Sequence, residues 1–218
     1  RPTETAAAPR VARRTELLDA AIAAIRREGP GASMEMIAAE AGVTKPVIYK
    51  HFGHREGLAK AIADRFAADL EAALLEALSG NLEGRELLAA TIDAYLAFVE
   101  QDPNVYRFLL HRVSQHPEAS SSLSGLIPRI GQQIALVLGE QLRDEGRDSG
   151  AAEPWAYGII GMVHVASDWW LARRTMPRAR MVQYLSELLW EGVSMMPAAS
   201  HMAASTEEVV RGLRSAAG

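Results

Sequence analysis

The side chains of this sequence that are best suited to bind a polyanion lie in one short segment, SMEMIAAEAGVTKPVIYKHF, which runs from Ser33 to Phe52. Its second half combines lysine and histidine with hydroxyl groups, so it offers positive charge and hydrogen-bond donors together. Cations neutralise DNA phosphates, and donors at helical spacing can reach base edges in the major groove. We therefore predict DNA contacts from Ser33, Thr44, Lys45, Pro46, Val47, Tyr49, Lys50 and His51.

Two short helices and a tight turn must present these side chains. Ser33 can cap a first helix, and Gly42 permits the positive φ that a short helix-helix turn requires. Thr44 is expected to cap the second helix, and Pro46 fits its first turn, where no backbone donor is needed. Ile48 then faces back toward the first helix, so the polar residues around it face outward.

Helical patterns extend this unit on both sides. Residues 10–28 form an amphipathic helix flanked by arginines, and from residue 58 apolar side chains recur at every fourth position. The leading basic helix, the core IAAEAGVTKPVIYKHF and the exit Phe52-x-x-Arg55-Glu56-x-Leu58 together resemble the DNA-binding domain of the TetR family of transcriptional regulators.

The resemblance implies further roles. In that family the third helix reads DNA and a basic residue at the start of the fourth helix binds a phosphate, a position that Arg55 holds here. Gly53-His54 replaces a more usual Pro-Ser or Asn-Ser pair ahead of that fourth helix. The family's body encloses an effector pocket, and its last two long helices pair with those of a second subunit.

Beyond residue 80 the apolar residues follow a helical period and none alternate with period two, so the sequence predicts an all-α fold. The expected architecture is an N-terminal three-helix DNA-binding domain joined to a helical ligand-binding and dimerisation domain. We expect a flexible arm over 1–9, the helix-turn-helix domain over 10–55, the effector-binding and dimerisation domain over 56–197 and a tail over 198–218. Body helices are expected near 83–101, 104–112, 120–142, 154–174 and 177–196, with a short one over 207–214.

The dimer core is expected from the last two of these helices. Gly158 and Gly161 would let helices approach closely, and Val182, Leu185 and Leu189 form an apolar stripe on the final helix. Two such helices from each subunit would form a four-helix core.

The candidate effector pocket is drawn from aromatic and apolar side chains of the body, because ligand sites are mostly apolar with a few placed polar groups. The predicted residues are Tyr95, Phe98, Phe108, Leu109, His111, Met162, Val165 and Trp169. His164 and Asp168 are further polar candidates, although their spacing of four also lets them pair with each other. Side chains of this kind more often form ordinary core. Body charge is not focused on any apolar segment, which favours a neutral or lipophilic effector.

Charge and composition agree with a DNA-binding protein. The formal net charge is −4, yet residues 1–60 hold ten Lys or Arg against seven Asp or Glu, while the remainder holds thirteen against twenty. Positive charge is therefore concentrated around the motif, as phosphate binding requires. The absence of cysteine excludes disulfides and thiolate metal sites and suits a reducing cytoplasm, where we expect the protein. No apolar run reaches the length of a membrane span.

These features predict a ligand-responsive repressor that binds a near-palindromic operator as a homodimer. One alternative is a helical small-molecule carrier or scaffold without DNA binding, against which Lys45, Lys50 and Arg55 argue. An all-helical enzyme is the less favoured alternative, because no phosphate-binding loop, metal-ligand spacing or cysteine nucleophile is present. We expect no catalytic residues, cofactor or metal. The expected partners are operator DNA, a small effector and a second copy of the chain.

Overall fold

A computed structural model describes residues 7–80, 82–115, 121–144, 146 and 148–194, without the side chains of 7–9, 111–115, 121–126 and 192–194. The described part is helical and holds no strand, which confirms the all-α prediction. Its elements are α1 (Ala7–Glu28), α2 (Met34–Glu40), α3 (Lys45–Phe52), α4 (Arg55–Leu78), α5 (Gly84–Gln101), α6 (Pro103–Gln115), α7 (Ser121–Asp144), the 3-10 turn η3 (Ser149–Ala151), α8 (Ala152–Arg173) and α9 (Arg178–Ser194).

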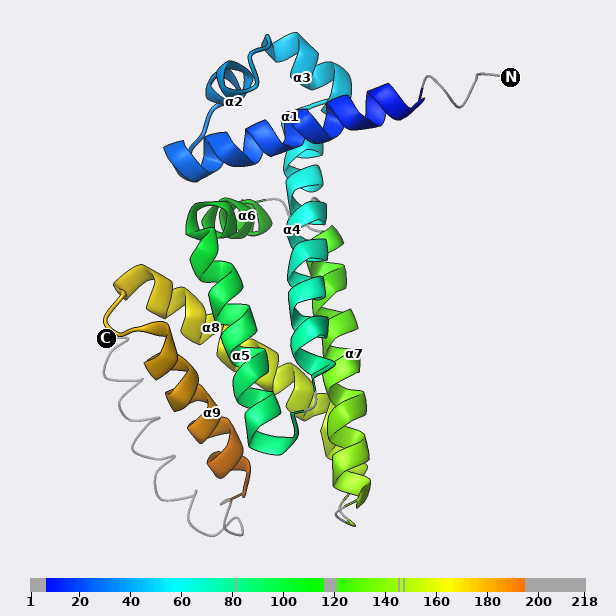
Figure 1. Ribbon diagram of the computed structural model, residues 1–218, viewed down its shortest axis with the longest axis vertical. Helices are drawn as coiled ribbons and strands as arrows, with labels where there is room; N and C mark the ends of the chain where they lie inside the picture. The colour runs from blue at the N-terminus through cyan, green and yellow to red at the C-terminus, as the bar shows by residue number, and fades with distance from the viewer. Residues whose placement is uncertain (1–6, 81, 116–120, 145, 147, 195–218) are drawn as a thin grey trace, which may run out of the picture.

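The helices are arranged as a head and a body joined by one long helix. The head, formed by α1, α2 and α3, lies at one end of the molecule, and α4 runs from it down into the body beside α7 (Figure 1). Helix α6 lies directly beneath α1, and α5 packs between α4 and α9. The head therefore contacts the body through two elements, α4 and α6.

A continuous apolar core explains why these helices pack in this way. Leu17, Ala21 and Ile25 form the buried face of α1. On α4 the residues at every fourth position from Leu58 are buried, so this helix contributes to the core of the head and of the body alike. The predicted amphipathic patterns of both helices are confirmed.

The structure shifts some of the expected boundaries. Helix α6 begins at Pro103, directly after the break at Asp102, and α7 continues as one helix through Pro128. The α8 helix begins at Ala152, two residues before Pro154. The greater part of the arm, the tail and the helix expected over 207–214 lie outside the described residues. No described helix is both long enough and apolar enough to cross a lipid bilayer.

Candidate DNA-binding surface and effector site

The helix-turn-helix of the head has the geometry that its sequence predicts. The Ser33 hydroxyl accepts a hydrogen bond from the N–H of Met36 at 3.2 Å and so caps α2. Gly42 has a φ of +63°, in the left-handed region that glycine tolerates best. The turn closes with a hydrogen bond from the N–H of Val43 to the carbonyl of Ala38 at 2.9 Å. Ile48 is fully buried and fixes the rotation of α3 against α2.

That rotation leaves the predicted DNA contacts on the outside of the head. The exposed members of the set are Thr44, Lys45, Pro46, Tyr49, Lys50 and Arg55, and the partly buried ones are Ser33, Val47 and His51. They come from the start of α2, from α3 and its cap, and from the first residue of α4. The structure thus gathers these residues on neighbouring elements, and their contact with DNA stays a prediction.

The cap of α3 differs from the expectation. Thr44 occupies the cap position with extended backbone angles, but its side chain makes no capping hydrogen bond. The first turn of α3 carries Pro46, which has no N–H to be satisfied. The Thr44 hydroxyl is therefore not used by the helix end, which leaves it available for an external partner.

The start of α4 is capped by an unusual residue. Nδ1 of His54 accepts a hydrogen bond from the N–H of Gly57 at 3.1 Å, so histidine takes the role for which serine is more usual. A Cβ at Gly57 would lie 2.0 Å from the carbonyl oxygen of Phe52, so the close turn requires glycine there. Beside this cap, a guanidinium nitrogen of Arg55 lies 3.5 Å from the carbonyl of Ala32, which joins the start of α4 to the loop before α2.

Acidic side chains modify the charge of the head. Lys45 forms an ion pair with Glu35 of α2, and both side chains are largely exposed. The hydrogen bond from Lys45, together with those from the Glu35 backbone and the Ser33 hydroxyl, lowers the pKa of the Glu35 carboxyl to about 2. Within the described part of the chain, Lys50 has no such partner. The two lysines of α3 therefore differ in their electrostatic surroundings.

The body contains a cluster of polar side chains at the meeting point of α5, α6 and α8. Nδ1 of His164 lies 3.0 Å from the Tyr95 hydroxyl and 3.1 Å from the Tyr106 hydroxyl. The Tyr106 hydroxyl donates to Asp168, so its oxygen is left to accept from His164 or Tyr95. The ring of Phe66, from α4, packs on those of Phe98 and Tyr106. We call Tyr95, Tyr106, His164 and Asp168 the polar cluster.

The hydroxyl groups of this cluster are held in their neutral form. Burial raises the pKa of Tyr95 to about 12, and the negative charge of Asp168 adds to the shift. Burial also raises the pKa of Tyr106, with further contributions from Tyr95 and Asp168. Both tyrosines therefore act as hydrogen-bonding groups rather than as bases at neutral pH.

The predicted pocket residues fall into two groups that the structure does not bring together. Tyr95, Phe98, Phe108 and Leu109 lie in or against the core, and Tyr95 belongs to the polar cluster. Met162, Val165 and Trp169 lie on the opposite, outward face of α8, with exposures of 39%, 66% and 46%. The side chain of His111 lies outside the described residues. His164 and Asp168 lie between that face and the buried face of α8, because a helix turns by about 100° per residue; their side chains contact Tyr106 but stay 39% exposed.

Sequence reasoning missed two residues of these sites. Tyr106 lies within the helix expected over 104–112 but is not among the predicted pocket residues, although its hydroxyl contacts Tyr95, His164 and Asp168. Glu35 was not assigned a role, because a glutamate in the first turn of a helix is common there for dipole reasons alone. The pairing of His164 with Asp168 was foreseen as an alternative, and their nearest polar atoms lie 4.0 Å apart.

A shallow hollow lies between α4 and α7, away from the polar cluster. Its empty volume is about 230 Å³, part of which is open solvent, and none of the predicted pocket residues lines it. Its walls are Glu71, Leu74, Leu75, Leu78, Arg129, Ile130 and Gln133. Because part of this volume is open solvent, the enclosed space is far below the roughly 300–1,000 Å³ that drug-sized ligands occupy.

A polar junction joins the head to the body at α6. Nε and Nη2 of Arg26, on α1, donate to the Asp102 carboxylate at 2.6 Å, and Asn104 donates to the carbonyl of Arg26 at 2.8 Å. Tyr106 of the polar cluster lies one turn further along α6 and donates its N–H to the carbonyl of Asp102 at 3.0 Å. The same short stretch of α6 therefore contacts both the head and the polar cluster.

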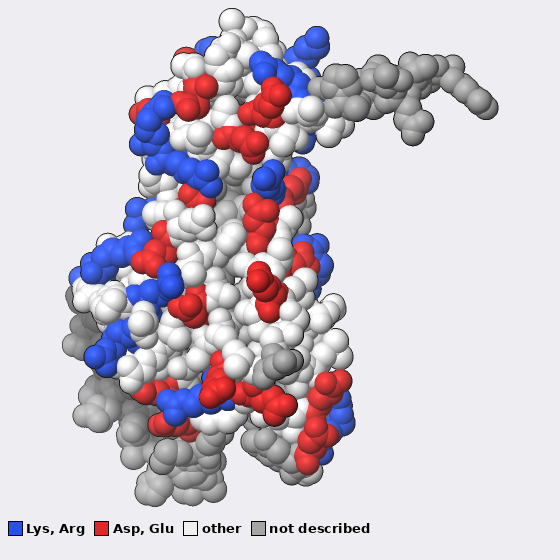
Figure 2. Space-filling view, in the orientation of Figure 1, with Lys and Arg blue, Asp and Glu red and all other residues white. Residues whose placement is uncertain are grey.

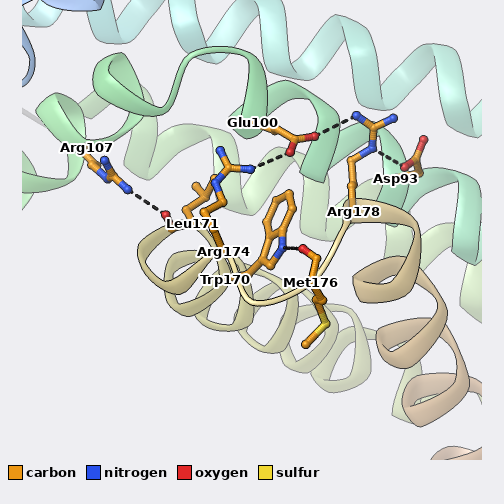
Figure 3. Close-up of polar contacts among 8 residues, drawn as sticks. All are labelled: Asp93, Glu100, Arg107, Trp170, Leu171, Arg174, Met176 and Arg178. Carbon is orange, nitrogen blue, oxygen red and sulfur yellow. Dashed lines mark hydrogen bonds and ion pairs between the residues drawn. The ribbon is translucent and has the colours of Figure 1, made fainter.

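The corner between α8 and α9 is held by a second set of polar contacts (Figure 3). Arg174 and Arg178 both contact Glu100 of α5, at 2.6 and 3.1 Å, and Arg178 also contacts Asp93 at 2.8 Å. The indole N–H of the fully buried Trp170 donates to the carbonyl of Met176 at 2.8 Å. These contacts determine the direction in which α9 leaves α8.

Helices α8 and α9 present large apolar side chains on their outer faces. On α9 the expected stripe of Leu185 and Leu189 is buried in the core of the chain, whereas Tyr184 and Leu188 are exposed. On α8 the exposed apolar residues share a face with Gly158 and Gly161, where an added Cβ would meet nothing within 4 Å. The outward face of α9 therefore carries Tyr184 and Leu188, and not the stripe with Leu185 and Leu189 that the sequence predicted for the dimer core.

Comparison with known proteins agrees with these observations. Residues 17–62 match the model described as bacterial regulatory proteins, tetR family, and residues 73–205 match the tetracyclin repressor-like C-terminal domain. An uncharacterized HTH-type transcriptional regulator of Mycobacterium tuberculosis is 36% identical over 84% of this chain and 78% of its own length. The HTH-type transcriptional activator FasR of Mycolicibacterium smegmatis is 27% identical over 87% of this chain and 86% of its own length.

Solved structures share the fold. A TetR-like transcriptional regulator from Rhodococcus sp. RHA1 has a TM-score of 0.65 and 24% identity, covering 84% of this chain and 96% of that one. The regulator FadR from Bacillus subtilis, solved in complex with stearoyl-CoA, has a TM-score of 0.63 and 19% identity, covering 82% of this chain and 98% of its own. The extent of the family matches and the identity to the mycobacterial relative show that this chain belongs to the TetR family of transcriptional regulators.

Proposed function

We propose that this TetR-family regulator is a repressor that binds a near-palindromic operator as a homodimer and releases it when a lipophilic effector binds the body. The observation that carries the proposal is the junction at α6, where one turn of helix separates the contacts to the head from the polar cluster. A regulator of chromosomal genes acts in the cytoplasm, and we propose that compartment. We also propose a boundary between head and body near residue 55, at the start of α4.

In the proposed DNA complex, α3 lies in the major groove. Phosphates are held by Lys45, Tyr49, Lys50 and Arg55, base edges are met by Thr44, Pro46, Val47 and His51, and Ser33 adds a backbone contact. The exposure of these side chains supports the assignment, as does the Thr44 hydroxyl, which the helix end does not use. Phosphate contacts set affinity and register, whereas base contacts set sequence preference.

Dimerisation is proposed through the outer faces of α8 and α9. These faces carry large apolar side chains that expose between 46% and 66% of their surface, and leaving them in water costs free energy. They are Val165, Trp169, Tyr184 and Leu188. The open space beside Gly158 and Gly161 allows a second helix to approach closely. A two-fold dimer of this kind would place two copies of α3 on successive major grooves, about 34–36 Å apart.

The effector is proposed to bind against the polar cluster. Of the pocket residues predicted from the sequence, this proposal keeps only those that lie in or against the core. Tyr95 and His164 would bind a polar group of the effector, and Phe98, Phe108 and Leu109 would contact its apolar part. Met162, Val165 and Trp169 are reassigned to the dimer face. FadR, a structural neighbour, was solved with stearoyl-CoA, which makes that molecule a reasonable first probe.

Coupling between the two sites is proposed to run through α6 and α4. An effector that displaces Tyr106 would move the start of α6, which carries Asn104 and directly follows Asp102, and α1 is held by both of these residues. Phe66 contacts Tyr106 from α4, whose first turn carries Arg55. Coupling is reciprocal, so DNA and effector would weaken each other's binding by the same factor, roughly 5- to 150-fold.

The DNA-binding half is tested by titrating duplex DNA at several salt concentrations with the wild type, Lys50→Ala and Arg55→Ala. Each substitution should weaken binding and lower the salt slope by about one unit, because one phosphate contact is lost. Arg143→Ala, an exposed change near the end of α7, is the matched control and should leave both quantities unchanged. If Lys50→Ala and Arg55→Ala behave like the control, the assignment is wrong.

The effector half is tested by repeating the titration with stearoyl-CoA present, on the wild type and on Tyr95→Phe. We expect the ligand to weaken operator binding by the wild type and to do so less in the variant, whose DNA binding without ligand should be intact. A reporter gene under the operator should be released from repression. A ligand that binds tightly but leaves operator affinity unchanged would contradict the proposed switch.

A further inference from the structure

The pairing of Glu35 with Lys45 places a negative charge among the cations of the proposed DNA-binding surface. Glu35 belongs to the first turn of α2, two residues after Ser33, and Lys45 is the first residue of α3. The ion pair joins two helices that both face the proposed DNA. Because three hydrogen bonds lower the pKa of Glu35 to about 2, its carboxyl is fully ionised at any pH at which DNA binding is measured.

The surface of the head agrees with this local picture. Basic and acidic side chains are interspersed over the head on the side shown in Figure 2, without one unbroken basic area. A carboxylate near DNA repels phosphates, and a lysine that is already paired gains less from neutralising one. Glu35 therefore lowers the affinity for DNA in any complex that is held by phosphate contacts alone.

We propose that Glu35 is a specificity-determining residue, which suppresses non-specific DNA binding by holding Lys45 until α3 is seated in its operator. In a loose complex, made only of backbone contacts, Lys45 keeps its partner on α2 and the carboxylate repels the duplex. In the operator complex, base contacts of α3 bring a phosphate close enough for Lys45 to exchange Glu35 for it. The inference rests on the proposed position of α3 in the major groove.

The test compares two DNA probes: a labelled duplex of scrambled sequence, and the operator selected by the wild type from a random-sequence library. Glu35→Gln should strengthen binding to the scrambled duplex about 3- to 10-fold at moderate salt and steepen its salt slope by about one unit. Affinity for the operator should change less, so the ratio of specific to non-specific affinity falls. Glu140→Gln is the matched control, with the same change of charge on α7 at the other end of the molecule.

A second pair of variants shows whether Glu35 acts through Lys45. Lys45→Ala should weaken operator binding more than binding to the scrambled duplex, because only the operator complex replaces Glu35 by a phosphate as the partner of this lysine. In the Lys45→Ala background, Glu35→Gln should have a smaller effect on the scrambled duplex than in the wild type. Circular dichroism and a thermal melt confirm that each variant is folded.

Several results would overturn the inference. Glu35→Gln could behave like Glu140→Gln, or it could raise affinity for both probes by the same factor, in which case Glu35 has no effect on specificity. An undiminished effect in the Lys45→Ala background would show that the ion pair is irrelevant. A wild type that binds no duplex at all would overturn the proposed function itself, and with it this inference, whereas the other outcomes leave the proposed function standing.

Discussion

The functional surfaces of the head and the body are built in opposite ways. In the head the cations proposed to contact DNA are exposed. The partner of Lys45 lies ten residues away in sequence, on a neighbouring short helix. In the body the polar cluster is partly buried, combines two neutral hydroxyl groups with His164 and Asp168, and links α5, α6 and α8 through hydrogen bonds such as that between Tyr95 and His164, 69 positions apart. The head presents charges that can exchange partners, whereas the body holds hydrogen bonds that cannot be broken without a replacement.

This difference explains how the two sites can work together. An exposed ion pair contributes little to stability, so DNA can replace it at small cost. A buried hydroxyl left without a partner costs more, so an effector must supply hydrogen bonds or displace the side chain. In the proposed mechanism, a change of partners in the polar cluster would reach α1 through α6, which contacts both.

The largest effect is expected in the body core, where adjacent tryptophans have different roles. Trp170→Ala should lower the free energy of unfolding by about 3–5 kcal/mol, because a fully buried ring and its bond to the Met176 carbonyl are lost. Trp169→Ala removes a ring that is 46% exposed and should instead weaken dimerisation. Chemical denaturation and analytical ultracentrifugation measure the two effects. Equal losses of stability for both variants would contradict the assignment of faces on α8.

Alkaline pH should weaken the body through Tyr95, the partly buried tyrosine of α5. The pKa of Tyr95 is raised to about 12, so the native state keeps a proton that the unfolded chain releases near pH 10. Stability from this group is therefore intact below pH 10 and falls between pH 10 and 12, by about 1.4 kcal/mol per pH unit. Urea denaturation of the wild type and Tyr95→Phe over this range should diverge accordingly. Parallel pH profiles would show that Tyr95 is not buried in its neutral form.

In the head, the two cap residues of the helix-turn-helix should differ in stability. Ser33→Ala should cost about 1 kcal/mol, because the hydroxyl caps the N–H of Met36. Thr44→Ala should cost only a few tenths, since its side chain makes no such bond, yet it should reduce operator affinity. Denaturation combined with operator titration separates the two roles. A large loss of stability in Thr44→Ala would restore the capping role that its sequence position suggests.

The smallest effect on stability is expected at the junction itself. Asp102→Asn weakens a pair whose arginine is half exposed, so the loss of unfolding free energy should stay below about 1 kcal/mol. Its effect on coupling should be larger in proportion, because Asp102 joins α6 to α1. Titration of operator DNA with and without stearoyl-CoA measures that coupling. Coupling that is unchanged in this variant would exclude α6 as the route.

The sequence predicted the head better than the body for physical reasons. The turn at Gly42 and the burial of Ile48 depend on spacing within one short segment, and both were anticipated correctly. The missing cap bond of Thr44 was not, because a residue preference does not determine a side-chain rotamer. In α8, apolar residues occur around most of the helix, so the pattern alone did not show that Trp169 faces outward while His164 lies beside Tyr95 and Tyr106.

The apolar stripe of α9 also could not be assigned to a partner from the sequence alone. Leu185 and Leu189 have the spacing of an interface, but α5 of the same chain covers them. An apolar stripe predicts that one face of a helix is buried, but it does not show whether the same chain or a second copy covers that face. The polar cluster could not be predicted from the sequence either, because it depends on the tertiary packing of α5, α6 and α8.

The central claim, that a dimer presents two copies of α3 to successive major grooves, is tested most directly by selecting binding sites from a random-sequence duplex library. We expect an enriched inverted repeat whose half-sites are centred about 10 base pairs apart or a multiple of that. Lys50→Ala and Arg55→Ala should enrich the same sequence more weakly, because these cations are proposed to contact phosphates rather than bases. Enrichment of a single asymmetric site by a monomer, or of no sequence at all, would contradict it.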